Sequence, residues 1–321
     1  MKSEEKKVAI LMSTYNGEKY ISDQINSIIN QTYQSWHLFI RDDGSTDNTR
    51  KIITKFCRRD DRITLFYDRV NLRPARSFLT LITKIDADFY FFSDQDDYWL
   101  KDKMQIMLDE IIKRDNTQPQ LVYCNLKCVD ENLKPKKYGF DNLIGKISGI
   151  NRFIGNDMPG CVMLFNKATR DLTKKYTVDF TNIVMHDWWI AIIAQTFGNI
   201  TFINKRLIYY RQHGNNTLGA GKAGSTFKKM FQKGLIKKQE NLVKQSFLQD
   251  MCFRKSFYSI LPDNVVYLLD QMSKCSNCFF IYRIFFLKKY NFKQISTIRT
   301  LAYYFTFVFL FNKSIYSKDK G

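Results

Sequence analysis

Short apolar runs alternate with helical patterns over residues 8–130, and this alternation restricts the fold more than any other feature of the chain. Val8–Ser13 has the composition of a buried strand, and the isoleucines that follow it between residues 21 and 29 recur on one face of a helix. Repeated strand–helix units predict a mostly parallel sheet flanked by helices, and therefore an α/β fold. Further strands are predicted at 38–41, 63–67, 89–93, 121–126, 161–165, 201–203 and 207–211, and further helices at 48–57, 76–84, 101–114 and from 187.

The C-terminal part of the chain differs from the rest in charge. Residues 222–321 contain 18 Lys or Arg and 5 Asp or Glu, so +13 of the net charge of +19 lies there. Gly, Ala and Ser cluster at 219–225, which is typical of a connection between domains. We therefore predict an α/β domain over residues 1–220 and a basic, aromatic-rich helical segment over 221–321.

Cysteine usage and hydropathy predict a protein that stays in the cytoplasm. The seven cysteines are an odd number scattered through apolar stretches, which favours reduced thiols over a disulfide framework. Cys275 and Cys278 form a CxxC pair without a second pair or a histidine cluster, so no zinc site is predicted. The apolar run Val8–Met12 is shorter than the apolar region of a signal peptide, and Leu301–Phe311 is shorter than the ~20 residues of a spanning helix.

Polar residues follow three of the predicted strands, as Ser13–Asn16, Asp42–Ser45 and Asp94–Asp97. Ligands of an open parallel sheet bind at the carboxyl ends of its strands, where such loops converge. Helix capping would account for the second loop alone. The third loop holds three carboxylates within four residues, and these repel one another unless a cation or buried donors neutralise them.

A divalent cation would meet that need. Mg²⁺ and Mn²⁺ prefer oxygen ligands, and Mg²⁺ usually takes one or two protein carboxylates while phosphate oxygens of a substrate complete its shell. The acidic loop therefore predicts Mg²⁺ or Mn²⁺ as a cofactor and a diphosphate as a ligand. On departure of the diphosphate, the metal would stabilise its negative charge.

Three motifs together resemble glycosyltransferase family 2: VAILMSTYNGEKYISDQINSIINQT at residues 8–32, DDGSTD at 42–47 and FFSDQDD at 91–97. This resemblance implies a GT-A fold, a nucleotide-diphospho-sugar donor, a DxD metal motif and inversion of the anomeric configuration. On the matching positions it places Ser13 and Tyr15 beside the nucleotide, Asp43 on the base, Asp94 near the ribose or a metal-bound water, and Asp96 on the metal. It leaves Asp97 open, with capping of the next helix as the structural alternative.

An inverting transfer needs a general base to take the proton of the acceptor hydroxyl. The resemblance points to Asp187 in the segment Met185–Trp189, where members of the family usually carry an acidic pair and this chain has His186 before Asp187. A helix N-cap is the alternative for Asp187. Trp188 and Trp189 are assigned to the acceptor side, where an aromatic ring can cover a sugar face, with burial in the core as the alternative. His186 is placed on the same side without a defined role.

The segment YRQHGNN at residues 210–216 adds two candidates. His213 resembles the late histidine that closes over the diphosphate and the metal in some members of the family, with an ordinary loop residue as the alternative. Arg211 is a candidate partner of the donor phosphates. Gly160, in the turn Pro159–Cys161, resembles part of the acceptor-side loop.

Lysines and arginines alternate with aromatic residues at 279–290. Apolar bulk flanked by cations suits a helix that lies in the headgroup zone of an anionic membrane. An amphipathic bundle that packs on the first domain is the alternative. The continuous aromatic and aliphatic runs, without a helix-turn-helix, RNA-binding or zinc signature, argue against a nucleic-acid partner. We therefore expect a peripheral protein at the cytoplasmic face of the membrane.

The combination of SDQDD, HDWW and YRQHGNN resembles bacterial rhamnosyltransferases that build cell-surface polysaccharide. It implies dTDP-L-rhamnose as the donor and a glycan or a lipid-linked glycan as the acceptor. The alternative among enzymes is a family-2 transferase that uses a UDP-hexose or a UDP-N-acetylhexosamine. A sugar-nucleotide-binding protein without catalysis is the alternative from another class, and it would not need Asp187.

Overall fold

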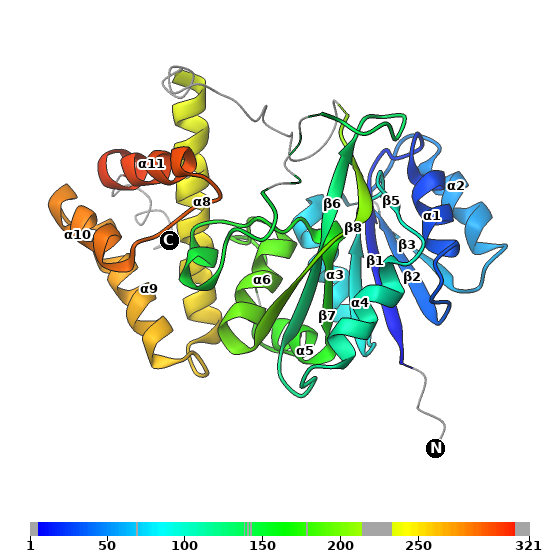
Figure 1. Cartoon of the computed structure of the whole chain (residues 1–321), viewed down its shortest axis with the longest axis horizontal. Coiled ribbons are helices and arrows are strands. Elements are labelled where there is room, and N and C mark those ends of the chain that lie inside the picture. The colour runs from blue at the N-terminus through cyan, green and yellow to red at the C-terminus, as the bar shows by residue number, and fades with distance from the viewer. Residues whose placement is uncertain are drawn as a thin grey trace. The chain divides into compact units, whose positions relative to one another are not determined.

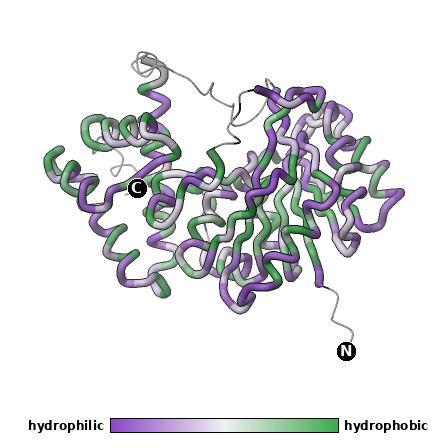
Figure 2. Tube along the Cα trace, viewed as in Figure 1, coloured by the Kyte–Doolittle hydropathy of each residue, from purple (hydrophilic) through white to green (hydrophobic). Residues whose placement is uncertain are grey.

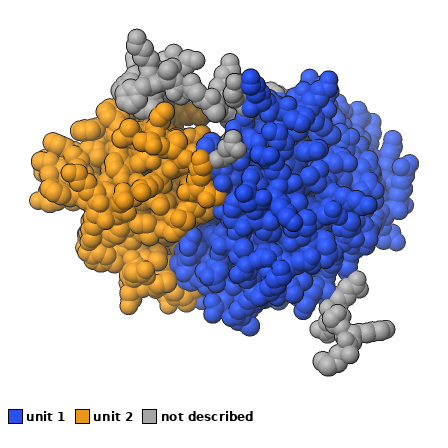
Figure 3. Space-filling model, in the orientation of Figure 1, with its two compact units in different colours: residues 1–144, 158–180, 185–223 blue, residues 145–157, 181–184, 224–321 orange. Residues whose placement is uncertain are grey.

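The computed structural model describes residues 6–68, 70–137, 139, 141, 143–177, 179–213 and 233–311. The chain divides into two compact units, coloured separately in Figure 3. Unit 1 consists of residues 1–144, 158–180 and 185–223, and unit 2 of residues 145–157, 181–184 and 224–321. The predicted boundary near residue 220 lies outside the described residues. Residues 145–157 and 181–184, which the sequence analysis assigned to the first domain, cluster with the helical unit.

Unit 1 is built around an eight-stranded sheet with the order β3-β2-β1-β4-β7-β6-β8-β5 (Figure 1). The strands are β1 (Val8–Thr14), β2 (Trp36–Asp42), β3 (Ile63–Tyr67), β4 (Phe89–Ser93), β5 (Tyr98–Trp99), β6 (Gln120–Val129), β7 (Met163–Asn166) and β8 (Asn199–Arg211). β1 pairs in parallel with β2 and β4, β2 with β3, and β6 with β8. β7 runs antiparallel to β4 and β6, and β5 runs antiparallel to β8. This topology confirms the predicted mixed, mostly parallel sheet.

The centre of the sheet is apolar on both faces. Ile10–Met12 of β1 and Phe91–Phe92 of β4 are fully buried, as expected for continuous apolar runs in strands that are covered on both sides. In the parallel register, Thr14 lies opposite Asp42, and Met12 lies opposite Ser93. The polar loops that follow β1, β2 and β4 therefore start at the same edge of the sheet, as the sequence predicts.

Six α-helices belong to the described part of unit 1: α1 (Ile21–Ile29), α2 (Thr49–Cys57), α3 (Arg73–Lys84), α4 (Lys103–Ile112), α5 (Lys167–Tyr176) and α6 (His186–Phe197). α3, α5 and α6 contact one another, and α1 contacts α2. The sequence analysis did not predict α5. Asn166 caps this helix, because its side chain accepts a hydrogen bond from the N–H of Thr169.

β8 is a single strand of 13 residues, whereas the sequence analysis predicted two short strands in its place. The register between β6 and β8 shifts at Asn125, where the pairing passes from Cys124 with Ile203 to Asn125 with Arg206. The polar run Asn204–Arg206 lies at this irregularity. It interrupts the apolar pattern from which strands are predicted, so one bulged strand looked like two.

The helical C-terminal segment is confirmed in unit 2. The described elements of unit 2 are η1 (Gly149–Phe153), α8 (Lys233–Phe257), α9 (Asp263–Ser276), α10 (Phe280–Tyr290), α11 (Thr297–Phe305) and the π-helical turn η3 (Thr306–Leu310). Phe253, Leu269 and Phe307 lie in its buried core. Among the helices that are described, none combines the length and the apolar character that a bilayer-crossing segment needs. Figure 2 shows that hydrophobic residues nevertheless recur along α10 and α11.

Candidate active site

Gln95 ties the loop after β1 to the acidic loop after β4. Its side-chain oxygen accepts hydrogen bonds from Thr14 Oγ1 (2.5 Å) and from the N–H of Tyr15 (2.9 Å), and its amide donates to the Tyr15 carbonyl (3.2 Å). Gly17 makes this approach possible, because a Cβ atom there would overlap Gln95 Oε1. The sequence analysis missed Gln95, for which the only signal was its position between two aspartates.

Ser13 and Tyr15, which were predicted to contact the nucleotide, lie at and just after the carboxyl end of β1. Ser13 is half-buried, and its hydroxyl donates to Ser77 Oγ at 2.7 Å. Tyr15 keeps 47% of its surface exposed, so its ring is accessible to a ligand.

Asp43 is almost fully buried at the end of β2. Its carboxylate accepts hydrogen bonds from the N–H groups of Leu72 (3.0 Å) and Arg73 (2.8 Å) and forms an ion pair with Arg41. Arg41 also donates to Ser77 Oγ at 3.1 Å. This network fixes Asp43 beside the loop that carries Ser13, and it joins the start of α3 to β2.

Asp96 and His213 meet although 117 positions separate them in the chain. His213 Nε2 and Asp96 Oδ2 are 2.8 Å apart. The imidazole also packs on Tyr20, with 4.8 Å between the ring centroids. A carboxylate oxygen and an imidazole nitrogen thus face each other at the edge of the sheet, and these are the two residues that the sequence analysis assigned to the metal.

Arg211 is directed into the protein. Its guanidinium donates to the Asp96 carbonyl (2.8 Å) and the Glu131 carbonyl (2.5 Å), forms an ion pair with Asp23 (3.0 Å) and lies over the ring of Tyr20. The residue is 2% exposed. In the structure the guanidinium holds the backbone of the acidic loop, and its predicted contact with donor phosphates stays a prediction.

Asp97 is the fully buried last residue of the same loop. Its Oδ1 accepts a hydrogen bond from the N–H of Arg211 (3.0 Å), so it joins the loop to the end of β8 and caps no helix. Burial raises the pKa of the Asp97 carboxyl well above its usual range, and the charges of Asp96 and Asp94 act in the same direction.

Asp94, Asp97 and Cys161 form a group whose oxygen and sulfur atoms lie within 4.8 Å of one another. Burial, followed by the charges of Asp96 and Asp187, raises the pKa of Asp94 to about 7. Burial also raises the pKa of the Cys161 thiol well above its usual range, so the sulfur stays protonated. The carboxylate oxygens are therefore the candidate metal ligands of this group, and such oxygens suit Mg²⁺ or Mn²⁺ better than a soft thiolate site would.

One fully buried cation lies among these groups. Lys103 Nζ donates to the carbonyl of Cys161 (2.6 Å) and lies 3.5 Å from the centroid of the Trp99 ring. Burial lowers the pKa of Lys103 to about 8, against the opposing charges of Asp97 and Asp94. The sequence analysis treated this lysine as part of an ordinary helix, because its only signal was position.

Asp187 is buried in the first turn of α6. Its Oδ2 accepts a hydrogen bond from the N–H of Gly160 at 3.0 Å, and its Oδ1 accepts one from the N–H of Trp188 at 2.5 Å. Burial raises its pKa to about 7. Because its charge contributes to the pKa of Asp94, the two carboxylates interact across the site.

His186 and the two tryptophans occupy different environments. His186 is 2% exposed and stacks on Phe78, with 3.9 Å between the centroids, and burial lowers its pKa to about 3. A Cβ atom at Gly160 would lie 2.8 Å from His186 Nε2. Trp189 is fully buried and donates to Thr177 Oγ1 (2.9 Å), so it belongs to the core and offers no face to a sugar. Trp188 is half-buried.

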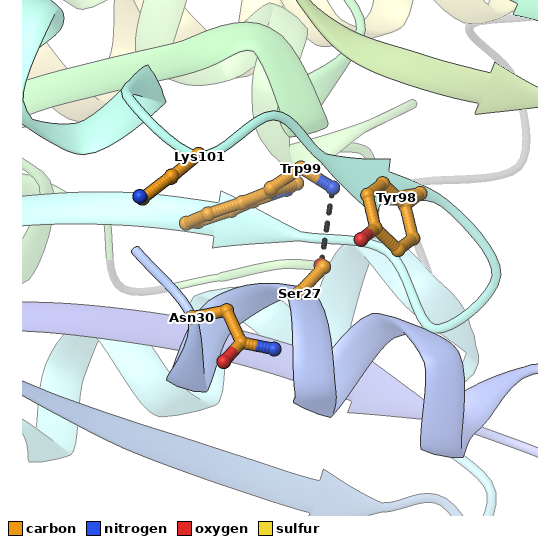
Figure 4. A pocket seen from close by; sticks show the side chains of 5 residues that line it. All are labelled: Ser27, Asn30, Tyr98, Trp99 and Lys101. Atoms are coloured by element: carbon orange, nitrogen blue, oxygen red, sulfur yellow. Dashed lines mark hydrogen bonds between the residues drawn. The ribbon is translucent and has the colours of Figure 1, made fainter. Parts of the chain in front are cut away.

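A separate cavity of about 330 Å³ is lined by Ser27, Asn30, Tyr98, Trp99 and Lys101 (Figure 4). The N–H of Trp99 donates to Ser27 Oγ at 3.1 Å within it. Its lining contains neither a carboxylate nor an imidazole. The cavity therefore lacks a metal ligand or base of the kind found around Asp94, and we assign no chemistry to it.

The comparisons with known proteins identify the same family as the motifs in the sequence. The model of the family described as glycosyl transferase family 2 matches residues 9–175. The chain is 31% identical to dTDP-rhamnosyl transferase RfbG of Shigella flexneri over 74% of this chain and 87% of that one. It is 27% identical to the Escherichia coli UDP-Glc:alpha-D-GlcNAc-diphosphoundecaprenol beta-1,3-glucosyltransferase WfgD, over 61% of this chain and 73% of that one.

Solved structures share the fold at low sequence identity. S. aureus TarS 1-349 in complex with UDP matches with a TM-score of 0.53 and 16% identity, over 76% of this chain and 65% of that one. The mannosyltransferase PcManGT from Pyrobaculum calidifontis, in complex with GDP-Man and Mn²⁺, matches with a TM-score of 0.52 and 13% identity, over 95% and 88%. These likenesses support the GT-A architecture of the sheet and its helices.

Proposed function

Because this chain belongs to glycosyltransferase family 2, we propose that it moves a sugar from a nucleotide-diphospho-sugar onto a glycan or lipid-linked acceptor with inversion, during polysaccharide synthesis. The observation that carries the proposal is the meeting, at one edge of the sheet, of an acidic loop, an imidazole and a separate buried carboxylate. A protein that only binds sugar nucleotides would not need Asp187, whose raised pKa suits a base near neutral pH.

The donor occupies the edge formed by the loops after β1, β2 and β4 in this proposal. Ser13, Tyr15 and Asp43 contact the nucleoside, and Asp94 lies near the ribose or the metal shell. Arg211 acts as a positioning residue for the acidic loop, as its hydrogen bond to the Asp96 carbonyl indicates.

Asp96 and His213 would hold Mg²⁺ or Mn²⁺. The site fits a divalent cation, since three carboxylates gather there, and burial together with the neighbouring negative charges raises the pKa values of Asp94 and Asp97. When bound, the metal would supply a Lewis acid for the departing diphosphate.

Asp187 takes the proton of the acceptor hydroxyl. Gly160 and Trp188 donate backbone hydrogen bonds that fix both of its oxygens, so the base is held before the acceptor arrives. The half-buried Trp188 is the remaining aromatic candidate for a sugar face on this side.

We assign dTDP-L-rhamnose as the preferred donor. The 31% identity to a dTDP-rhamnosyl transferase over most of both chains supports it, together with the SDQDD, HDWW and YRQHGNN motifs. A UDP-hexose is the second candidate, favoured by the 27% identity to a UDP-glucose-dependent enzyme. The lipid-linked acceptor in the name of that relative favours an acceptor of the same class here, and hence a site of action at the cytoplasmic face of the membrane.

A donor panel tests these assignments. Release of nucleoside diphosphate is measured from dTDP-, UDP- and GDP-sugars, with and without Mg²⁺ or Mn²⁺, in the presence of a lipid-linked glycan. Metal-dependent turnover of dTDP-L-rhamnose is expected, with loss in Asp96→Asn and Asp187→Asn. Donor binding is followed by calorimetry in parallel. Binding without turnover for every acceptor would favour the non-catalytic alternative, and turnover of a UDP-sugar alone would replace the donor.

A further inference from the structure

The outer side of α11 and η3 is apolar where a solvated helix is normally polar. Ile298, Leu301, Phe305 and Phe309 recur at intervals of three or four residues and are each at least 40% exposed. The opposite side, with Tyr303 and Phe307, is buried. A helix with apolar residues on both sides needs a second apolar environment besides its own core.

α10 contributes to the same surface. Phe279 and Phe285 are 81% and 65% exposed. The ring of Phe280 stacks on Phe309 with 6.1 Å between the centroids, and Phe305 lies 5.4 Å from Phe309. These ring contacts join Phe280 of α10 to the exposed side of α11 and η3. We call the exposed apolar residues of this region the aromatic surface, defined by Phe279, Phe280, Tyr282, Phe285, Leu301, Phe305 and Phe309.

Arg283 fixes the shape of the aromatic surface from behind. Its guanidinium donates to the carbonyls of Cys275 and Ser276 at the end of α9, and to those of Phe307 and Phe311 around η3. The arginine satisfies carbonyls that the helix ends leave unpaired. These hydrogen bonds hold α10 against η3, while Phe280, Tyr282 and Phe285 of α10 remain exposed.

The segment that carries the aromatic surface has charges of one sign. Residues 279–311 contain five Lys or Arg and no Asp or Glu. Apart from Arg283, these are Lys288, Lys289, Lys293 and Arg299, and all four are exposed. A second copy of the chain on this patch would bring like charges together, whereas an anionic lipid surface complements both the charge and the apolar rings.

We propose that the aromatic surface docks unit 2 on an anionic lipid bilayer, with the rings at the level of the headgroups and the lysines against the lipid phosphates. The helices lie on the membrane, consistent with the lack of a spanning segment among the described helices. The proposal concerns a surface separate from the residues of the proposed reaction and does not depend on that reaction.

Vesicle co-sedimentation tests the docking. The full chain is mixed with vesicles of phosphatidylcholine alone or of phosphatidylcholine with phosphatidylglycerol. Binding to the anionic vesicles is expected, and it should weaken with added salt. We expect Phe305→Ser and Phe309→Ser each to weaken partitioning roughly tenfold, equivalent to about 1.4 kcal/mol. Lys288→Gln with Lys289→Gln should weaken binding to anionic vesicles only.

Tyr258→Ser is the matched control, because Tyr258 lies in unit 2 and is 59% exposed, like Phe309. It should bind vesicles like the wild type. An unchanged thermal unfolding transition, followed by circular dichroism, shows that Phe309→Ser is folded. Asp187→Asn should lose turnover and keep vesicle binding, which separates the two proposals. Docking is overturned if the wild type stays in the supernatant with both kinds of vesicle, or if Phe309→Ser binds anionic vesicles as well as the wild type does. It is also overturned if Phe309→Ser converts a dimer of the chain into a monomer, since the patch would then be a contact between two copies.

Discussion

At the scale of a single residue, the burial of Asp187 determines how readily its carboxylate accepts a proton. Its carboxylate lies in the first turn of a helix, and two backbone N–H groups stabilise its charge while desolvation opposes it. The result is a pKa of about 7, which is several units above the usual value for an aspartate. Such a group is about half ionised at neutral pH, and its ionised form is basic enough to accept a proton.

The rate of transfer should therefore depend on pH through this residue. Protonation removes the base, so kcat/KM is expected to fall about tenfold per unit as the pH drops below about 7 and to level off above it. Asp187→Asn keeps a side-chain oxygen that can accept the hydrogen bond from the Gly160 N–H, but it should lower kcat by about 10²–10⁴-fold. A pH profile of both proteins checks this. A wild-type rate that is constant from pH 5.5 to 8 would contradict the assignment.

Lys103 should contribute more to stability than the exposed Lys101 two positions before it. Lys103→Met removes the donor to the Cys161 carbonyl and the positive charge near Asp94 and Asp97. We expect a loss of about 2–4 kcal/mol in the free energy of unfolding, measured in urea. Lys101→Met changes an exposed lysine two positions away and should cost less than about 0.5 kcal/mol. Equal effects of the two substitutions would refute the role of the buried cation.

At the scale of elements, the turn at Gly160 and the start of α6 depend on each other. An alanine side chain at Gly160 would press against His186 Nε2, while the Gly160 N–H holds Asp187. Gly160→Ala is therefore expected to lower kcat about tenfold or more with an unchanged affinity for the donor, since the base moves and the donor loops do not.

A double-mutant cycle tests whether the contact with His186 causes the loss of kcat expected for Gly160→Ala. His186→Ala removes the group that the new methyl would strike, so the double variant should lose less than the sum of the two single losses. Steady-state kinetics and donor titrations on the four proteins supply the numbers. Strict additivity would mean that Gly160 acts through some other contact.

The loops of the site could be predicted from the sequence because the strands that carry them pair in register. Once β1, β2 and β4 are recognised as parallel, their polar carboxyl ends must lie together. The contacts of Gln95 and Lys103 could not be predicted. Each joins a side chain to backbone groups 58–80 positions away, and a single sequence carries no information on such pairs. The inward direction of Arg211 was missed for the same reason.

At the scale of the whole molecule, unit 2 contains an uncompensated acid. Both oxygens of Asp250 in α8 are buried without a hydrogen-bond partner among the described residues, and burial raises its pKa well above the usual range. The folded state therefore holds a proton that the unfolded chain releases above pH ~4. This contribution to stability is complete below that pH and is lost as the pH rises toward the raised pKa.

Asp250→Asn should remove this dependence. The variant is expected to gain stability relative to the wild type as the pH increases from 5 to 8, by up to about 1.4 kcal/mol per unit. Thermal unfolding followed by circular dichroism at several pH values measures the difference. Asp263→Asn, at the exposed start of α9, serves as the control and should show a nearly constant difference. A constant difference for Asp250→Asn as well would contradict the assignment.

The interleaving of the two units has a consequence for biosynthesis. Residues 145–157 lie within the sequence of unit 1, yet their partners belong to unit 2: the ring of Phe153 packs on Phe253, and the Ile154 carbonyl accepts a hydrogen bond from Gln294. A chain truncated after residue 220 would therefore expose these side chains to solvent, and it would not be a self-contained domain. On the ribosome, Phe153 precedes Phe253 by a hundred residues, a delay of roughly 5–20 s at typical synthesis rates. During that interval the partners of Phe153 and Ile154 have not yet been synthesised.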